Sequence, residues 1–256
     1  MRNVIQLGLH KNAEWSYLTQ ENWLFVMREN LRSQYRLPTY FTQDESTFRY
    51  FGIDASPNSV DRVRKIYNNC PNAYFIACCL TTNFSIEKII NADYSEEMCG
   101  YWNEFWGEEK HILYPGMPLS FLIENLGVED ISVLASDIDY SEVNAFSDIH
   151  AWKIKPEMIS YELAVINNPV IIDAKIKNAG YIHFRTVPQY TLEESEESFV
   201  RGWMHEHQFI RADIFQEHPY HFPVYHVLHS EESKEYWLTN NNDVDASTVL
   251  VLEKKT

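Results

Sequence analysis

Short apolar runs alternate with amphipathic helical patterns along the first 186 residues, and this alternation restricts the fold more than any other feature of the sequence. The apolar runs predict strands at residues 3–8, 49–54, 73–79, 131–137, 158–163 and 181–186. The helical patterns lie at 21–36, 59–68, 119–125 and 168–178. Continuous apolar runs are typical of parallel strands that are covered on both faces. We therefore expect an α/β fold with a doubly wound, mostly parallel sheet, whose ligand sites lie beyond the carboxyl ends of the strands.

Two segments interrupt the alternation. Residues 93–110 mix acidic and aromatic side chains without helical periodicity, which predicts a long surface loop, with a short helix closing one face of the sheet as the alternative. The segment 189–256 begins with an acidic run and ends in a strand-like stretch at 247–252. We expect a Rossmann-like domain at 1–188 and a C-terminal extension at 189–256, whose last strand returns to the sheet edge and pairs antiparallel.

Composition and charge exclude several classes of protein. The 256 residues are 45% hydrophobic and 14% aromatic, which is too apolar for a disordered chain. The net charge of −16 disfavours binding to nucleic acid or to an anionic membrane surface. No segment approaches the roughly 20 apolar residues of a membrane span, and the N-terminus lacks the apolar core of a signal peptide. The four cysteines form no C-x-x-C pair, which indicates free thiols and a cytoplasmic location.

The ends of the first two predicted strands carry residues suited to binding a nucleoside. Gly8 follows the first strand, where a glycine lets the backbone approach a ligand closely, although a plain turn is the alternative. Asp54 ends the second strand, where such sheets place a carboxylate that accepts hydrogen bonds from ribose hydroxyls. Their spacing of 46 positions exceeds the usual spacing of about 20 and indicates an insertion after the first helix. Asp54 can also act with Ser56 and Pro57 to cap the next helix.

Carboxylates gather at the ends of the next two predicted strands. Asp137, Asp139 and Glu142 follow the strand at 131–137, and Glu162 lies near the end of the strand at 158–163. Asp137, Asp139 and Glu162 are candidate oxygen ligands of Mg²⁺, or they orient a substrate hydroxyl. The structural alternative is that these acids stabilise a helix N-terminus through the helix dipole.

Histidines concentrate in the C-terminal extension, which holds six of the ten: His205, His207, His218, His221, His226 and His229. Imidazole suits zinc, but these spacings match no compact zinc finger and no H-E-x-x-H helix. We therefore expect histidines that face solvent or are satisfied within the core, and no metal ligation by them. The P-loop pattern and the hydrolase pattern G-x-S-x-G are absent, which argues against a P-loop phosphotransferase and an α/β-hydrolase.

Taken in order, several segments resemble the FkbM-type family of S-adenosylmethionine-dependent methyltransferases, which have a class I, Rossmann-like fold. The segments are VIQLG at 4–8, FGIDASP at 51–57, NAYFIA at 72–77, residues 120–142, KPEMISYE at 155–162 and AGY at 179–181. The resemblance covers about residues 3–185. Asp137, Asp139 and Glu142 fit the family pattern, with Tyr140 in place of its glycine. The acid that leads the family's glycine-rich turn is replaced by Gln6.

The resemblance implies methyl transfer from S-adenosylmethionine to an oxygen or nitrogen atom. It implies Asp137 as the base or substrate orienter, with Glu162 second. It implies these cofactor contacts: Gly8, His10, Asp54, Ala55, Ala77, Cys78 and Asp137, with Asp54 on the ribose and strand 75–78 beside the adenine. The expected substrate is a hydroxyl of a small molecule or sugar-like intermediate. An N-methyltransferase acting on a peptide or other intermediate, and a binding or scaffold protein that no longer holds cofactor, are the alternatives.

Overall fold

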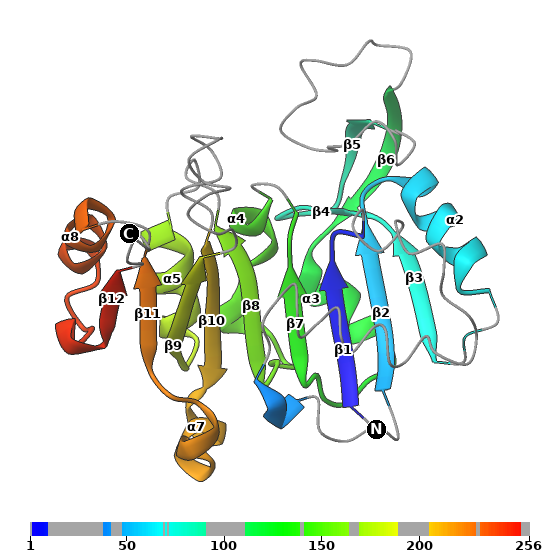
Figure 1. Ribbon diagram of the computed structural model, residues 1–256. Helices are drawn as coiled ribbons and strands as arrows, with labels where there is room; N and C mark the ends of the chain where they lie inside the picture. The colour runs from blue at the N-terminus through cyan, green and yellow to red at the C-terminus, as the bar shows by residue number, and fades with distance from the viewer. Residues whose placement is uncertain are drawn as a thin grey trace.

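The computed structural model describes residues 2–9, 38–41, 48–68, 70, 72–90, 111–138, 141–163, 169–188, 205–228 and 231–251 (Figure 1). Several sequence predictions lie outside these residues: the helix at 21–36, the loop at 93–110, and the side chains of His10, Asp139 and His229. Within the described part of the chain, no helix is long and apolar enough to cross a membrane.

A nine-stranded sheet forms the centre of the molecule, in the order β12-β11-β9-β10-β8-β7-β1-β2-β3 (Figure 1). Its strands are β1 (Arg2–Leu7), β2 (Phe48–Asp54), β3 (Ala73–Ala77), β7 (Val133–Ser136), β8 (Met158–Leu163), β9 (Tyr181–Pro188), β10 (His205–Arg211), β11 (Tyr225–Leu228) and β12 (Val249–Val251). All neighbouring pairs are parallel except the two made by β10, which runs antiparallel to β8 and to β9. The predicted fold class, a mostly parallel doubly wound sheet, is confirmed.

The antiparallel strand differs from the one that the sequence predicted. The stretch at 247–252 does form a strand at the sheet edge, but this strand, β12, pairs in parallel with β11. The antiparallel strand is β10, which comes from the segment 189–256 and lies inside the sheet between β8 and β9. The reason is chain direction: β11 runs parallel to β9, and β12 continues that direction after a helical crossover through α8 (Glu231–Asn240). The boundary at 188 stays a prediction, although β10 completes the sheet of the preceding domain.

Helices cover both faces of this sheet. They are α2 (Pro57–Ile66), α3 (Leu119–Asn125), α4 (Glu142–Ala145), α5 (Pro169–Asn178), α7 (Ala212–Glu217) and α8, with short 3-10 turns η2 (Thr39–Phe41), η6 (Ile149–Ala151), η8 (Pro219–His221) and η9 (Ala246–Thr248). A second sheet, in the order β4-β6-β5, is built from β4 (Cys79–Leu80), β5 (Ser85–Ile90) and β6 (His111–Met117), which the sequence did not predict as a separate unit.

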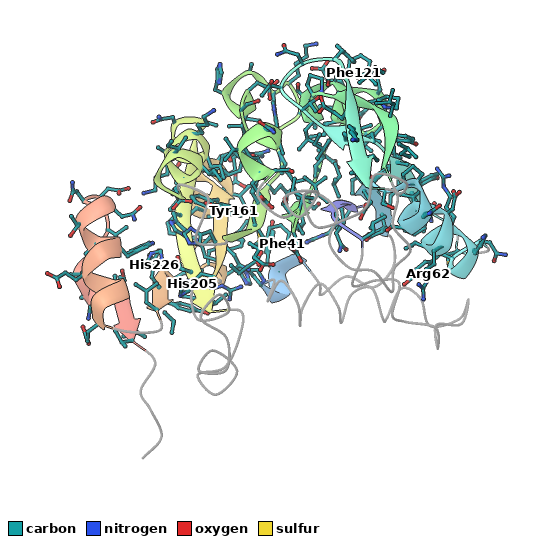
Figure 2. The ribbon with its side chains drawn as sticks, turned by 90° about the horizontal axis from the view of Figure 1, so that it is seen from above. Phe41, Arg62, Phe121, Tyr161, His205 and His226 are labelled. Carbon is teal, nitrogen blue, oxygen red and sulfur yellow. The ribbon has the colours of Figure 1, made fainter. Side chains whose placement is uncertain are left out.

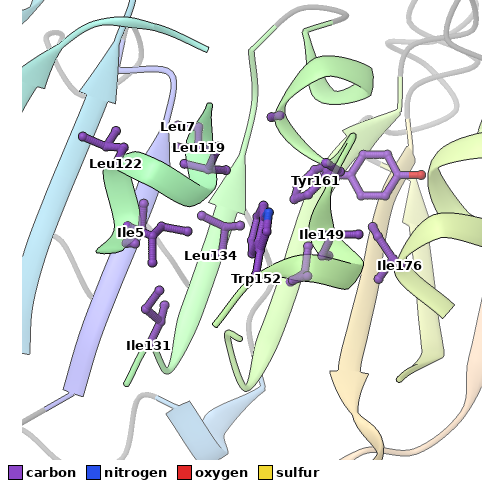
Figure 3. Close-up of a cluster of buried hydrophobic side chains, with 14 of the residues drawn as sticks. Ile5, Leu7, Leu119, Leu122, Ile131, Leu134, Ile149, Trp152, Tyr161 and Ile176 are labelled. Atoms are coloured by element: carbon purple, nitrogen blue, oxygen red, sulfur yellow. The ribbon is translucent and has the colours of Figure 1, made fainter. Parts of the chain in front are cut away.

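Two apolar clusters lie on opposite faces of the main sheet. One packs α3, α4 and α5 against side chains such as Ile5, Leu134 and Ile159 (Figure 3). The other packs α2, η2 and α7 against side chains such as Val4 and Val133. Neighbouring residues of one strand, Val4 and Ile5, belong to different clusters because successive side chains of a strand point to opposite faces. This two-sided burial explains why these strands are continuous apolar runs in the sequence.

Candidate functional site

The candidate site lies where the strand order of the main sheet reverses. β1 pairs with β2 on one side and with β7 on the other, so the chain leaves β1 and β7 toward opposite edges of the sheet. In open α/β sheets this reversal opens a crevice beyond the carboxyl ends of the strands, where ligands bind. The predicted residues Gly8, Asp54 and Asp137 follow or end these three strands and lie at this edge.

Gly8 forms the tight turn after β1. Its φ is +85°, a backbone conformation that residues other than glycine rarely adopt. A Cβ at this position would lie 1.9 Å from the carbonyl oxygen of Asp137, the residue that follows β7. The Gly8 amide donates to the Ile53 carbonyl at 2.8 Å, and the Asp137 amide donates to the Leu7 carbonyl at 2.9 Å. Glycine is therefore required here by the close approach of the β7 backbone, and contact with a ligand stays a prediction.

The carboxylate of Asp54 holds the ends of β1 and β2 together. Its Oδ2 accepts a hydrogen bond from the Leu9 amide and its Oδ1 accepts one from the Ser56 amide, each at 2.8 Å. The helix cap is the side chain of Ser56, which accepts from the Ser59 amide at 3.3 Å, with Pro57 in the first helical turn. Asp54 thus supports the cap through the backbone of Ser56. The carboxylate therefore has a structural role at the ends of β1 and β2, and its contact with ribose hydroxyls stays a prediction.

The residues predicted to flank an adenine lie beside Asp54. Ala77 pairs with Asp54 across β2 and β3, and the Cys78 amide donates to the Asp54 carbonyl at 3.0 Å. Ala55 and Ala77 are half-buried, whereas Cys78 is buried. Burial, followed by the nearby Cys79 and Asp54, raises the pKa of the Cys78 thiol to about 12. Cys78 is therefore a protonated packing residue at neutral pH.

The structure brings the predicted acids of β7 and β8 to one edge. Ser136 pairs with Tyr161, so Asp137 and Glu162 follow at the same level on neighbouring strands, and both are buried. Glu142 has a structural task, because its Oε1 accepts from the Ile138 amide at 3.0 Å and from the Ser136 hydroxyl at 3.3 Å.

Sequence reasoning missed one acid of this edge, Glu206. It pairs with Glu162 across β8 and β10, is buried, and accepts from the Ser160 hydroxyl at 2.5 Å. No local signal identified it, because β10 was not predicted as a strand.

The Mg²⁺ hypothesis gains no support from the described residues. Among them, the one group of three side chains placed to ligate a metal ion is Asp173, His183 and His207, which includes neither Asp137 nor Glu162. The third proposed ligand, Asp139, is outside the described residues.

Buried histidines instead form a polar cluster between α5 and strands β8 to β11. His205, His207 and His226 of the C-terminal extension are buried, His218 is half-buried and His221 is exposed. Figure 2 shows His226 toward α8 and Tyr161 farther into the sheet. His221 faces solvent and His207 has a partner in the core, as the sequence predicted, whereas Nε2 of His226 is buried without a hydrogen-bond partner among the described residues. His183 and Asp173 were missed because the cluster combines distant segments of the chain.

Contacts within this cluster centre on Asp173. Its Oδ1 accepts from the Tyr161 hydroxyl at 2.5 Å, and its Oδ2 lies 3.1 Å from His207 Nδ1. Burial, then the charge of Asp173, raises the pKa of Tyr161 well above its usual value. Burial, then the neighbouring His207 and His226, holds the pKa of His183 well below its usual value. His183 is therefore neutral at physiological pH.

Fold and site together define a class: a Rossmann-like α/β protein with buried acidic residues near the reversal of its strand order. No family model and no curated protein matches the chain. Among solved structures, it is similar to a TehB-like SAM-dependent methyltransferase from Corynebacterium glutamicum, with 10% identity, a TM-score of 0.37, and coverage of 82% of this chain and 80% of that one.

Two fibrillarins show similarity of the same order. For Aeropyrum pernix fibrillarin in complex with natively bound S-adenosyl-L-methionine, the identity is 11% and the TM-score 0.40; for the Methanococcus jannaschii fibrillarin pre-rRNA processing protein they are 10% and 0.41. In both cases 82% of this chain is covered, and it spans 66% of the fibrillarin. Similarities this weak carry no argument about function, which therefore has to come from the site.

Proposed function

We propose that this protein is an S-adenosylmethionine-dependent methyltransferase of the FkbM type that methylates a hydroxyl of a small molecule or sugar-like intermediate. The observation that carries the proposal is the edge at the strand reversal, where the turn at Gly8, the carboxylate of Asp54 and the buried acids Asp137 and Glu162 follow adjacent strands. This edge is where an open α/β sheet binds nucleotide-like ligands.

The described residues fit such a cofactor in two respects. Asp54 is half-buried, so its carboxylate is held by backbone amides on one side while part of its surface remains exposed. A carboxylate at the end of the second strand is the group that such sheets use to accept hydrogen bonds from ribose hydroxyls. Ala55 and Ala77, which lie next to this carboxylate in the chain and across the β2–β3 pair, are small and half-buried, and they are the proposed contacts of the base.

The acids of β7 and β8 suit the chemistry of methyl transfer. When bound, S-adenosylmethionine supplies a methyl group attached to a positively charged sulfur. Asp137 is the proposed base or orienter, and Glu162 is the second candidate. As the substrate oxygen bonded to the methyl carbon and the methyl–sulfur bond broke, releasing S-adenosylhomocysteine, the Asp137 carboxylate would accept the proton that the hydroxyl loses. Clustered carboxylates also favour a cationic cofactor over its neutral product, and they exclude bulk anions from the edge.

A specific observation favours a second function, that of a binding or scaffold protein without cofactor. Gln6 stands where the family has an acid, and its side chain is used within the turn: Nε2 donates to the Gly8 carbonyl at 2.9 Å, and Oε1 accepts from the Tyr50 hydroxyl at 2.7 Å. In this arrangement the residue at the acid's position stabilises the protein's own turn.

Calorimetric titration with S-adenosylmethionine and S-adenosylhomocysteine separates the two functions. We expect both compounds to bind the wild-type protein. Asp54→Asn should weaken binding by roughly tenfold or more, because it removes a hydrogen bond to a charged group. Asp61→Asn, which changes an exposed acid on α2, is the matched control and leaves affinity unchanged. Thermal unfolding of both variants checks that the fold is kept.

The outcome for the wild-type protein decides the enzyme proposal. No detectable heat up to millimolar cofactor would overturn it and leave the binding or scaffold function. If cofactor binds, mass spectrometry of methylated products from a panel of hydroxyl and amine compounds distinguishes O-methylation from N-methylation.

A further inference from the structure

We propose that Asp173, His183 and His207 form a binding site for a divalent transition metal ion, with zinc as the best-fitting ion, that fastens α5, β9 and β10 to one another. This site is separate from the ligand edge at Gly8 and Asp54, and it does not depend on the proposed methyltransferase activity.

The three side chains offer the right atoms at the right separations. Oδ2 of Asp173 lies 3.1 Å from Nδ1 of His207 and 3.9 Å from Nδ1 of His183. Ligand atoms around a tetrahedral zinc ion, with bonds of about 2.1 Å, lie about 3.4 Å apart. The two observed separations bracket this value, and the three candidate ligand atoms all lie within 4.8 Å of one another. Small side-chain rotations would therefore complete the coordination.

His183 provides an independent indication of a ligand. Its side chain is 1% exposed, and its Nδ1 has no hydrogen-bond partner within the described part of the chain. This nitrogen faces the Asp173 carboxylate at 3.9 Å, too far for a hydrogen bond. A buried polar atom without a partner is costly, whereas a cation between the nitrogen and the carboxylate would satisfy both.

The other nitrogen of His183 is held as metal-binding histidines usually are. His183 Nε2 lies 3.0 Å from the Thr186 hydroxyl oxygen, which in turn lies 2.9 Å from His226 Nδ1. When Nε2–H donates to Thr186 and the Thr186 hydroxyl donates to His226, Nδ1 of His183 carries a lone pair directed at the site. Metal-ligating histidines commonly donate their second N–H in this way, which fixes the tautomer. The opposite hydroxyl orientation gives the metal-free tautomer, with Nδ1–H toward Asp173.

The chemistry of the ligand set selects the ion. Two imidazoles and one carboxylate suit zinc and other transition metals, whereas Mg²⁺ and Ca²⁺ prefer oxygen ligands. All three side chains are at least 97% buried, which is typical of a structural site. The Tyr161 hydroxyl, already beside Asp173, is the candidate for a fourth ligand position. Because the three ligands come from α5, β9 and β10, a bound ion would crosslink these elements.

Direct metal binding tests the proposal. The full chain, treated with a chelator and then dialysed, is titrated with Zn²⁺, and bound metal is measured by elemental analysis. We expect one Zn²⁺ per chain, and affinity reduced at least a hundredfold in His183→Gln and His207→Gln. Thr186→Val keeps all three ligands. We expect its affinity for Zn²⁺ to fall about 10- to 100-fold, which is the usual effect of removing a group that orients a ligand.

The matched control is the double variant His218→Gln, His221→Gln. His221 ends η8 and His218 precedes it, and the centroids of their two rings are 6.2 Å apart. This double variant should bind Zn²⁺ as the wild-type protein does. Failure of the wild-type protein to bind stoichiometric Zn²⁺, or loss of binding in this control but not in His183→Gln, would overturn the proposal.

Cobalt substitution keeps the test decisive if a ligand variant does not fold. Co²⁺ added to the wild-type protein is expected to give the intense visible absorption of a tetrahedral site, without a thiolate charge-transfer band, since the proposed ligands include no cysteine. A weak octahedral spectrum or a thiolate band contradicts the assignment. All these measurements omit S-adenosylmethionine, so their failure is distinguishable from failure of the methyltransferase proposal.

Discussion

The two halves of the main sheet place their polar groups differently. In the half formed by β3, β2, β1 and β7, the strands bury mostly apolar side chains, and the candidate ligand residues follow the strands at their carboxyl ends. In the half formed by β8, β10, β9 and β11, polar side chains lie within the sheet layers themselves, including Ser160, Arg185, Glu206, His207 and Gln208.

Both faces of the second half carry such contacts. On one face, Tyr161 and His207 meet Asp173. On the other, the Gln208 amide donates to the Ser160 hydroxyl at 3.1 Å, and Arg185 Nε donates to Gln208 Oε1 at 2.6 Å. The first half is thus specified by close backbone approach and apolar packing, and the second by pairs of buried polar groups that require each other.

The largest effect we predict is for Gly8→Ala in the first half. The new Cβ would meet the Asp137 carbonyl at 1.9 Å, and the φ of +85° disfavours alanine. We expect a loss of more than about 3 kcal/mol in the free energy of unfolding, measured by urea denaturation.

Gly127→Ala is the control for backbone conformation alone. Gly127 also has a positive φ, +67°, but nothing lies within 4 Å of the position that a Cβ would take. It should cost only about 1 kcal/mol. Equal losses in the two variants would contradict the close approach of the β7 backbone to Gly8.

Two buried tyrosines give an intermediate effect and compare the halves directly. Tyr161 donates to the carboxylate of Asp173, whereas Tyr50 donates to the neutral amide oxygen of Gln6. Hydrogen bonds to charged groups contribute more, so we expect Tyr161→Phe to cost about 2 kcal/mol and Tyr50→Phe about 1 kcal/mol in chelator-treated protein. Denaturant unfolding of both variants measures this, and a larger loss for Tyr50→Phe would reverse the proposed contrast.

The smallest effect is a pH dependence that belongs to the second half. Burial lowers the pKa of His226 to about 3, and that of His183 is also lowered, so the folded protein keeps both neutral below pH 6.5 while the unfolded chain binds protons. Stability therefore falls as pH decreases from 6.5, and His226 alone contributes about 1 kcal/mol to this fall between pH 6.5 and 5.5. His226→Gln should make this fall shallower by that amount, and the exposed His221→Gln should leave it unchanged. An identical pH profile for His226→Gln and the wild-type protein would contradict the burial of a neutral His226.

The sequence predicted the first half well because its signals are local. β2 (Phe48–Asp54) begins one residue before the predicted 49–54, and α3 (Leu119–Asn125) matches its predicted bounds, since continuous apolar runs and helical spacing are visible within a few residues. β10 was missed because the first four residues of its sequence, HEHQFIR, are all polar. Their burial depends on partners in β8, β9 and α5.

The same distinction applies to the candidate sites. Asp54 and Asp137 were identified because an acid at the end of an apolar strand is a local pattern, and the strands do end together. The cluster of Asp173, His183 and His207 has no recognisable spacing, because it forms only when α5, β9 and β10 are assembled.

The position of β10 also affects the order in which the sheet can form. β8 and β9 do not pair with each other, because β10, which comes later in the chain, lies between them. During synthesis, β9 and its helix α5 therefore emerge before the strand that joins them to β8 exists. Until residues 205–211 insert, β8 presents an unpaired edge, which is a hazard for pairing with other chains. The sheet consequently cannot be completed until the last quarter of this chain has been synthesised. Variants that delay the insertion of β10 are expected to aggregate during folding rather than after it.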